Sequence, residues 1–406
     1  MPDRTNSSRR LIYLKASLLT LILALVAGSR LQADSGSCGG QTLTLPFTDV
    51  MGSSFFCSIA EIYFQGITFG TTPTTYSPST NVTRDQMAAF LSRTLDTGLQ
   101  RGSKRAALDQ FWTTTPHYDL GLGVTGPVGP PTLLTHSDGL HVWVAGLQEV
   151  HRVRASDGKL LDSWTGATGS YGVLCAMGRV FVTGGFIGTP ALYMIDPAAS
   201  PGPVTTVATI LGNLPKGIAF DGNKIWLACE GGFVSIVTPG STIPWSATNV
   251  GGFLSLKGIV YDGANMWVTE YGGVSPDHLK KLDSSGNVLQ TVTLGSGLGG
   301  FPVFDGMNIW VPNESSNSVT VVRASSGEIL ATLSGNGLNH PTAAAFDGER
   351  ILVTNNAGDS VSLWKATDLT PLGTFSTGAG THPVGACSDG QYFWIALNGT
   401  GELARF

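Results

Sequence analysis

Ionisable and amide side chains recur at fixed distances from seven turn dipeptides in this sequence. The turns are Asp138-Gly139, Met177-Gly178, Asp221-Gly222, Asp262-Gly263, Asp305-Gly306, Asp347-Gly348 and Asp389-Gly390. Six to eight residues before the glycine stand Lys216, Lys257, His340 and His382, and seven or eight residues after it stand Glu230, Glu270, Glu314, Asn313, Asn355 and Asn398. If each turn joins two antiparallel strands, both sets meet at the far end of the hairpin. His and Glu there are suited to general acid and base chemistry, or to holding a small polar ligand or a cation.

A structural interpretation of these residues stays open. Asn commonly caps turns, Lys and Glu keep a surface hydrated, and a repeat duplicates such residues without any ligand. His340-Pro341 and His382-Pro383, at matching places in adjacent units, favour the ligand interpretation. The sequence therefore supports a binding site with no assigned catalytic residue. Because we expect these positions to be exposed, their substitution should cost within roughly 0.5 kcal/mol of stability.

The elements that position these residues follow from the repeat. After each turn comes an apolar strand around one large residue, namely Trp143, Phe181, Trp226, Trp267, Trp310, Leu352 and Trp394. Strands that are apolar on both faces are buried between layers. Units of about 42 residues with several short strands and Gly-rich turns are typical of propeller blades. The sequence predicts a mainly all-β fold, a seven-bladed β-propeller of four-stranded blades over residues 115–406.

The two ends of the repeat region predict how the ring closes. The last unit supplies only three strands before the chain ends, and segment 119–126 resembles segment 371–378, which fills the outer position of the sixth unit. We therefore expect one N-terminal and three C-terminal strands to form the seventh blade, which leaves no open seam.

Composition excludes several classes. Only 13% of the 406 residues are charged, and 54 are glycine, which argues against a helical bundle or a coiled coil. The net charge of -5 offers no basic surface for phosphates, so we expect no nucleic-acid partner.

The N-terminus has the pattern of an export signal. Basic residues precede an apolar run over 16–28, and a small residue follows at Ala33, so residues 1–33 are predicted to be a cleaved signal peptide. The alternative is a retained anchor, which alone would bring the chain to a membrane. We expect an exported protein at the cell surface, in the periplasm or outside the cell.

Export changes how the five cysteines are interpreted. Cys38 and Cys57 flank a short segment and are expected to form a disulfide, while Cys175, Cys229 and Cys387 are expected to be small buried apolar residues. No spacing matches a zinc site, and we expect neither a metal nor a cofactor.

Residues 34–95 are expected to form a separate helical module. Phe47-Thr48-Asp49-Val50, the apolar residues at 59, 62 and 63, the turn at 66–68 and the helix start Thr83-Arg84-Asp85 resemble an S-layer homology module. That resemblance implies binding of cell-wall polysaccharide with a contribution from Arg84. Family members usually carry three such modules, whereas this chain has one, and Gln86 replaces the usual acid. Residues 96–114 are expected to be a linker.

A second resemblance concerns the repeats. Segments 351–356 and 359–363, with 313–322 as a weaker copy, resemble the YVTN and NHL propellers of bacterial surfaces. Such propellers include binding modules, lactone hydrolases and antibiotic lyases. We expect a binding or scaffold protein tethered to the cell envelope, with an unidentified protein or glycan at the propeller rim. The alternative is a lyase or lactone hydrolase that uses rim His and Glu. A quinone-dependent dehydrogenase is disfavoured, because its tryptophan docking repeats and its adjacent cysteines are absent.

Overall fold

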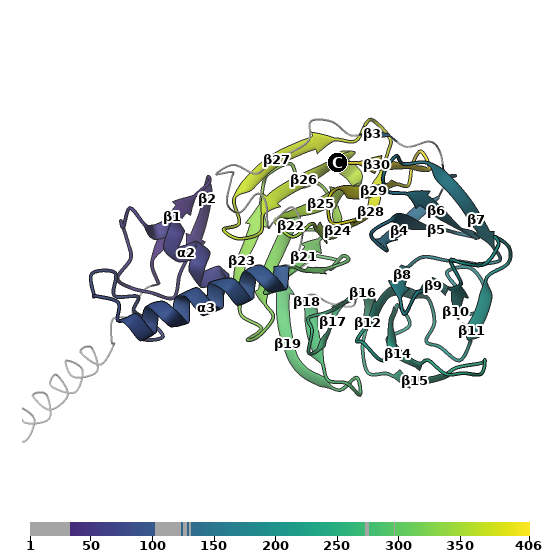
Figure 1. Ribbon diagram of the computed structural model, residues 1–406, viewed down its shortest axis with the longest axis horizontal. Coiled ribbons are helices and arrows are strands. Elements are labelled where there is room, and N and C mark those ends of the chain that lie inside the picture. The colour runs from purple at the N-terminus through teal and green to yellow at the C-terminus, as the bar shows by residue number, and fades with distance from the viewer. Residues whose placement is uncertain (1–32, 102–122, 125–127, 130, 273–275, 296) are drawn as a thin grey trace, which may run out of the picture.

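Seven four-stranded antiparallel sheets are arranged as a ring, with a smaller N-terminal region at one side (Figure 1). The computed structural model of the chain describes residues 33–101, 123–124, 128–129, 131–272, 276–295 and 297–406. The predicted signal peptide therefore lies outside the described residues, except for Ala33. No helix in the described ranges is both long and apolar enough to span a membrane.

Blades 1 to 6 each use four consecutive strands, and the first strand of each lies innermost. Blades 1 to 3 consist of β4 (Thr132–Ser137), β5 (His141–Gly146), β6 (Glu149–Arg154) and β7 (Leu160–Thr165); β8 (Val173–Ala176), β9 (Arg179–Gly184), β10 (Ala191–Ile195) and β11 (Thr205–Ala208); and β12 (Pro215–Phe220), β13 (Ile225–Cys229), β14 (Phe233–Thr238) and β15 (Ser246–Val250). Blades 4 and 5 consist of β16 (Ser255–Tyr261), β17 (Met266–Tyr271), β18 (Asp277–Leu282) and β19 (Val288–Gly295), then β20 (Val303–Phe304), β21 (Asn308–Asn313), β22 (Ser318–Arg323) and β23 (Ile329–Ser334). Blade 6 consists of β24 (Pro341–Phe346), β25 (Arg350–Asn355), β26 (Ser360–Lys365) and β27 (Pro371–Ser376), with a short 3-10 turn, η1 (Asn356–Gly358).

Blade 7 closes the ring as predicted. It combines β28 (Pro383–Ser388), β29 (Phe393–Leu397) and β30 (Glu402–Arg405) with β3 (Gly123–Val124) from the other end of the propeller region. In the register, Gly123 faces Arg405 and Val124 faces Ala404. The prediction of seven four-stranded blades is confirmed, and so is closure by one N-terminal and three C-terminal strands.

The Asp-Gly turns join the innermost strand to the second strand, and their aspartates have a structural task. In blade 4, Asp262 accepts hydrogen bonds from the backbone N–H groups of Ala264 (2.8 Å) and Asn265 (2.6 Å) and from the indole of Trp267 (2.7 Å). The glycine next to it has φ of +93°, which glycine adopts without strain. One carboxylate thus holds the turn in place and accepts the indole N–H of a fully buried tryptophan. The same Asp–Trp bond recurs in blades 1, 3, 5 and 7.

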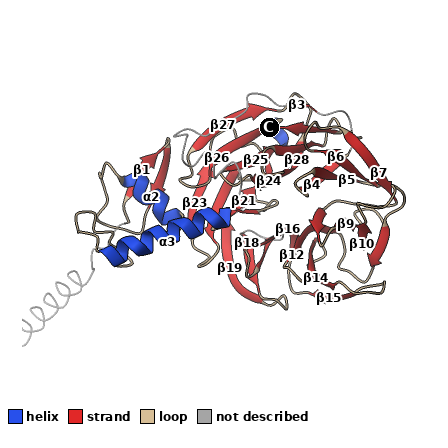
Figure 2. Cartoon of the chain, in the orientation of Figure 1, coloured by secondary structure: helices blue, strands red, loops and turns tan. Residues whose placement is uncertain are grey.

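The N-terminal region contains two short strands and two helices, drawn red and blue in Figure 2. The strands are β1 (Ser35–Cys38) and β2 (Gln41–Thr44), and the helices are α2 (Phe56–Phe64) and α3 (Arg84–Arg101). Cys38 and Cys57 form the expected disulfide, which joins β1 to α2. At the start of α3, Thr83 and Gln86 exchange hydrogen bonds between side chain and backbone, so Gln86 completes a capping box. The helix extends past the start of the expected linker, whose residues from 102 on lie outside the described part.

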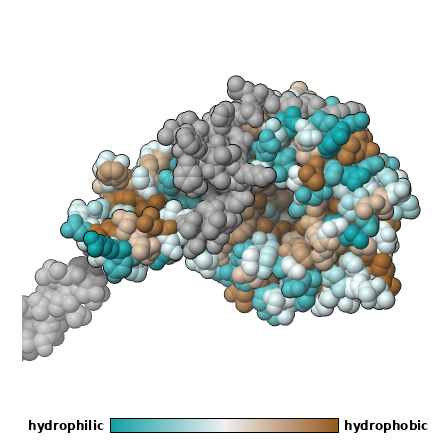
Figure 3. Space-filling model, in the orientation of Figure 1, coloured by the Kyte–Doolittle hydropathy of each residue, from teal (hydrophilic) through white to brown (hydrophobic). Residues whose placement is uncertain are grey.

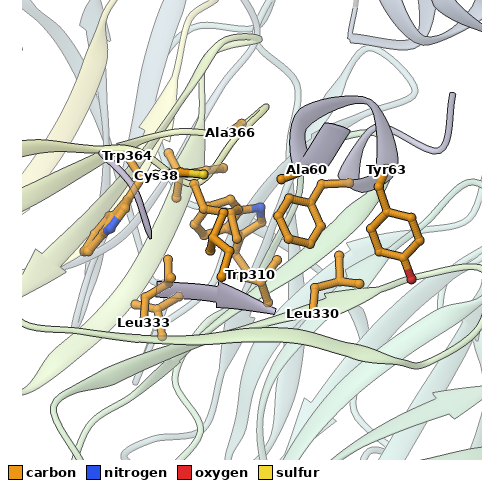
Figure 4. Packing of buried hydrophobic residues seen from close by; sticks show 14 of the residues in the cluster. Cys38, Ala60, Tyr63, Trp310, Leu330, Leu333, Trp364 and Ala366 are labelled. Atoms are coloured by element: carbon orange, nitrogen blue, oxygen red, sulfur yellow. The ribbon is translucent and has the colours of Figure 1, made fainter. Parts of the chain in front are cut away.

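The N-terminal region shares its core with blades 5 and 6. Figure 4 shows Cys38, Ala60 and Tyr63 packed together with Trp310, Leu330, Leu333, Trp364 and Ala366 in one buried cluster. Polar contacts tie the same surfaces: Arg323 donates a hydrogen bond to the carbonyl oxygen of Tyr63 (2.7 Å) and lies over its ring. Arg323 ends β22 beside Asn308, so the contact is at the end of the blades that carries the Asp-Gly turns. The opposite end of the ring is not used by these contacts.

Candidate functional site

The innermost strands surround a central channel, whose cavity measures about 500 Å³. Figure 3 shows the hollow inside the ring of blades. The lining is mostly apolar, with His136, Cys175 and Cys387 among its polar members. We call the channel mouth opposite the Asp-Gly turns the distal mouth. The ends of β12 and β13 that pair Pro215 with Cys229 mark it in blade 3.

A first ion pair at the distal mouth lies within blade 3 and is hydrogen-bonded to a tyrosine of blade 4. Lys216, on β12, donates a hydrogen bond to Glu230 (2.5 Å), which follows β13. Tyr271, the last residue of β17, donates its hydroxyl to the same carboxylate oxygen. One carboxylate therefore holds an ammonium and a phenol from neighbouring blades.

A second ion pair lies beside the first. Lys257, on β16, donates to Glu314, which follows β21 in blade 5. His340 of blade 6 lies with its Nε2 3.9 Å from the other oxygen of Glu314. The backbone of His340 has φ of +56° and its N–H donates to Asn317 Oδ1 (2.7 Å), so the loop holds the imidazole over the mouth. Only 5% of the Glu314 side chain is exposed, compared with 44% of the His340 side chain.

Three aromatic rings complete the cluster. Lys216 lies 5.1 Å from the ring centroid of Tyr171 and 5.5 Å from that of Phe186, while Lys257 lies 5.5 Å from that of Phe301. Tyr171 also contacts both phenylalanine rings, with centroids 5.8 and 5.9 Å apart. The ammonium groups are therefore held against aromatic faces as well as carboxylates.

Burial sets the protonation of this cluster. It raises the pKa of the Tyr171 hydroxyl, and the nearby carboxylates of Glu314 and Glu230 raise it further. The pKa of Tyr271 is raised by burial and by its hydrogen bond to Glu230. Burial lowers the pKa of Lys257, against the opposing effect of Glu314. Both tyrosines are therefore hydrogen-bond donors at neutral pH.

The other predicted residues lie at the same end of the blades but outside this cluster. Glu270 accepts from Lys280 (2.6 Å) and from the backbone N–H of Leu254. Asn313 and Asn355 are buried and donate to Ser and Thr hydroxyls of their own blades. Asn398 donates to the carbonyl of Thr132 (3.0 Å) and links blades 7 and 1, and His382 contacts Asp359 and the carbonyl oxygen of Asn356.

The expectation that these positions are exposed was wrong for Asn313 and Asn355, which are buried, and for three charged residues. Glu270 and Glu314 are 2% and 4% exposed, and Lys257 is 8% exposed. These residues are buried because side chains of adjacent blades surround them at the narrow mouth. Counting residues along one hairpin does not reveal these contacts between blades. Within the described ranges, no group of three or more His, Cys, Asp or Glu residues is arranged to hold a metal ion.

Sequence reasoning missed Tyr171, Tyr271, Phe186 and Phe301. Tyr271 could have been predicted, because it stands eight residues after Gly263, the position at which the preceding and following units carry Glu230 and Glu314. Tyr171 and Phe301 lie at the same end of the innermost strands, but aromatic residues there resemble core residues. No sequence signal separates the two roles.

The free cysteines are only partly as expected. Cys229 is buried, whereas Cys175 and Cys387 are half-buried and line the channel. Burial raises the pKa of Cys387 to about 12 and that of Cys229 to about 11, so both stay as unreactive thiols at neutral pH.

The chain is a seven-bladed β-propeller, and comparison with solved structures agrees. It is similar to hydrazine synthase from Kuenenia stuttgartiensis (TM-score 0.58, 16% identity, 71% of this chain and 99% of that chain). Virginiamycin B lyase from Staphylococcus aureus matches with a TM-score of 0.57 and 15% identity, over 70% of this chain and 98% of the other. The WD40 propeller of Doa1 matches with a TM-score of 0.57 and 12% identity, over 70% and 96%. At these identities the likeness establishes the fold. No family model and no curated protein matches the sequence.

Proposed function

We propose that this protein is a binding protein whose distal mouth recognises a saccharide. The observation that carries the proposal is the pair of neighbouring networks, Lys216–Glu230–Tyr271 and Lys257–Glu314, set against aromatic rings. Ammonium and phenol groups donate hydrogen bonds, and carboxylates accept them, so the mouth offers both partners that sugar hydroxyls need. Aromatic faces beside these groups suit the apolar C–H faces of a sugar ring.

The charge balance favours a neutral ligand. Two ammonium groups face two carboxylates, so neither an anion nor a cation gains a net attraction. Breaking either pair would leave a charge buried without its partner, which is costly. A polyhydroxylated ligand can add hydrogen bonds to the free lone pairs and N–H groups of both networks while the pairs stay intact.

A glycan array probed with the full chain, followed by calorimetry, tests the proposal. Tyr271→Phe removes one hydroxyl at the mouth and should weaken binding of the best glycan by about tenfold. Tyr261→Phe is the matched control, because its hydroxyl bonds the Gly263 carbonyl in an exposed turn at the other end of the same blade. A lack of binding to every glycan on the array would refute the proposal.

A second candidate is a lyase or lactone hydrolase, the alternative drawn from the sequence. It is favoured by His340 and Glu314, which lie 3.9 Å apart across blades 5 and 6, as an acid and base pair would. One similar structure is described as a catalytically inactive virginiamycin B lyase in which a histidine is replaced by alanine. Turnover of lactones or cyclic esters that is lost in His340→Ala would select this candidate over a binding role.

Attachment to the cell envelope through residues 34–95 is also a proposal. Arg84 lies exposed in the first turn of α3, free of the core shared with the propeller. Pull-down of the chain by cell-wall polysaccharide should weaken in Arg84→Ala, while Arg179→Ala on blade 2 should leave it unchanged. Equal retention of both variants would mean that Arg84 does not bind the wall polymer.

A further inference from the structure

Large apolar side chains are exposed on the face of the ring that surrounds the distal mouth, which we call the distal face. They belong to loops of blades 2 to 5 and are Phe186, Ile187, Ile210, Phe233, Leu254 and Leu298. Each of these loops or strand ends adjoins the ends of β9, β11, β13, β15 or β19 that lie opposite the Asp-Gly turns. The side chains are held on a rigid frame of blades and are distributed over four of them.

The same loops are almost free of charge. Segments 185–190, 209–214, 230–232, 251–254 and 297–302 contain one ionisable residue, Glu230, and that residue is paired with Lys216 at the mouth. The distal end of blade 4 also carries the pair Lys280–Glu270 (2.6 Å), whose side chains are only 16% and 2% exposed. Large apolar side chains that are exposed together on one face mark a surface that another apolar body covers.

The arrangement on this face is the reverse of a protein–protein interface. Such interfaces place apolar residues at the centre and polar residues at the rim. Here the polar networks of Lys216 and Lys257 are central, and the apolar side chains lie around them. A ligand that is complementary to this pattern has a polar head for the mouth and apolar chains for the surroundings.

We propose that the distal face binds a glycolipid in a bilayer, with the saccharide head in the distal mouth and the surrounding apolar side chains against the lipid. This inference rests on the saccharide specificity proposed above and adds the lipid portion. Phe186 connects the two parts, because its ring lies 5.5 Å from Lys216 while 44% of the residue is exposed. The hydrogen bond between Arg323 and Tyr63, which docks the N-terminal region, lies at the turn end of blade 5 and so on the opposite side of that blade from the distal face.

The test compares each saccharide of the array in two forms, as a soluble glycoside and as a dialkylglycerol conjugate in phosphatidylcholine vesicles. The full chain should bind the vesicle conjugate of its preferred sugar at least about tenfold more tightly than the glycoside. The triple variant Ile187→Ser, Ile210→Ser and Leu254→Ser should lose this gain and keep its affinity for the soluble glycoside.

The control variant carries the same change at similarly exposed sites of the turn end. Leu140, Val288 and Leu289 are 73%, 46% and 57% exposed, against 78%, 50% and 57% for Ile210, Ile187 and Leu254. Leu140→Ser, Val288→Ser and Leu289→Ser should therefore bind vesicles as the parent does. A loss of the gain in both variants would overturn the inference, because the distal position would then not matter.

The remaining outcomes separate this inference from the proposal beneath it. Equal affinity of the parent for glycoside and conjugate overturns the glycolipid inference and leaves saccharide binding standing. No binding in either form overturns both. Equal binding to vesicles without sugar, or a dimer in solution that the triple variant abolishes, would show that the face binds bare lipid or a second copy, and the inference would be wrong.

Discussion

Glu314→Gln should destabilise the protein strongly although the residue lies at a channel mouth. The amide keeps the shape of the side chain but removes the carboxylate that neutralises Lys257, which is 8% exposed. Removing one partner of a buried pair costs about 3–5 kcal/mol. Because 11% of the Lys257 side chain is still exposed, we expect the lower end, about 3 kcal/mol.

The loss should depend on pH in a defined direction. Burial already lowers the pKa of Lys257, and removing Glu314 lowers it further, because that carboxylate favours the charged form. In the unfolded chain lysine titrates near about 10.4, so above the folded-state pKa the unfolded chain binds more protons and stability rises with pH. The deficit is therefore full below the folded-state pKa of Lys257 in the variant and shrinks as the pH rises above that pKa towards about 10.

Urea denaturation of parent and variant at neutral pH and near about pH 9.5 measures both effects. Lys257→Met with Glu314→Gln in the same chain is the control, and it should recover most of the loss because no buried charge remains. A single variant that loses less than about 1 kcal/mol, or a deficit that is constant with pH, would refute the assignment of a buried and mutually dependent pair.

Three further predictions concern the frame. Asp262→Ala leaves the indole of Trp267 without an acceptor and should cost about 2–3 kcal/mol, read from urea denaturation, and a loss below about 0.5 kcal/mol would contradict the turn's role. Deletion of residues 115–128 removes β3 and should lower the melting temperature and induce association through the open edge; an unchanged monomer would show that closure is dispensable. Cys57→Ser should lower the melting temperature without affecting glycan binding, because the disulfide with Cys38 lies far along the chain from the mouth; lost binding would show coupling between the two regions.

The sequence predicted the frame because its signals are local. The Asp-Gly turn and the tryptophan five residues after the Asp are joined by a hydrogen bond within one hairpin, so the pattern that repeats is also the physical unit. Ring closure was predictable for the same reason, since segment 119–126 repeats an outer strand. The disulfide was predictable because Cys38 and Cys57 are the two cysteines of the first hundred residues.

What the sequence could not predict are contacts between blades. Lys257 and Glu314 come from different blades and are 57 residues apart, so their pairing depends on the ring's radius and on which side chains fill the channel. Counting residues from the turns predicted at which end of its hairpin each residue lies. It did not predict which residue of a neighbouring blade each one contacts. The packing of Tyr63 on Arg323 is still more distant, at 260 residues, and no pattern in either segment indicates it.

The docked N-terminal region also has a mechanical consequence. Ring closure depends on β3, which among the described residues pairs with β30 at two positions. A pull on the N-terminal end of the described chain reaches the region around Cys38 and Tyr63 before it reaches β3. That region is bound to blades 5 and 6 by a buried core and by Arg323, so the load enters the ring there. The core shared with blades 5 and 6 thus carries the load and keeps the force away from β3.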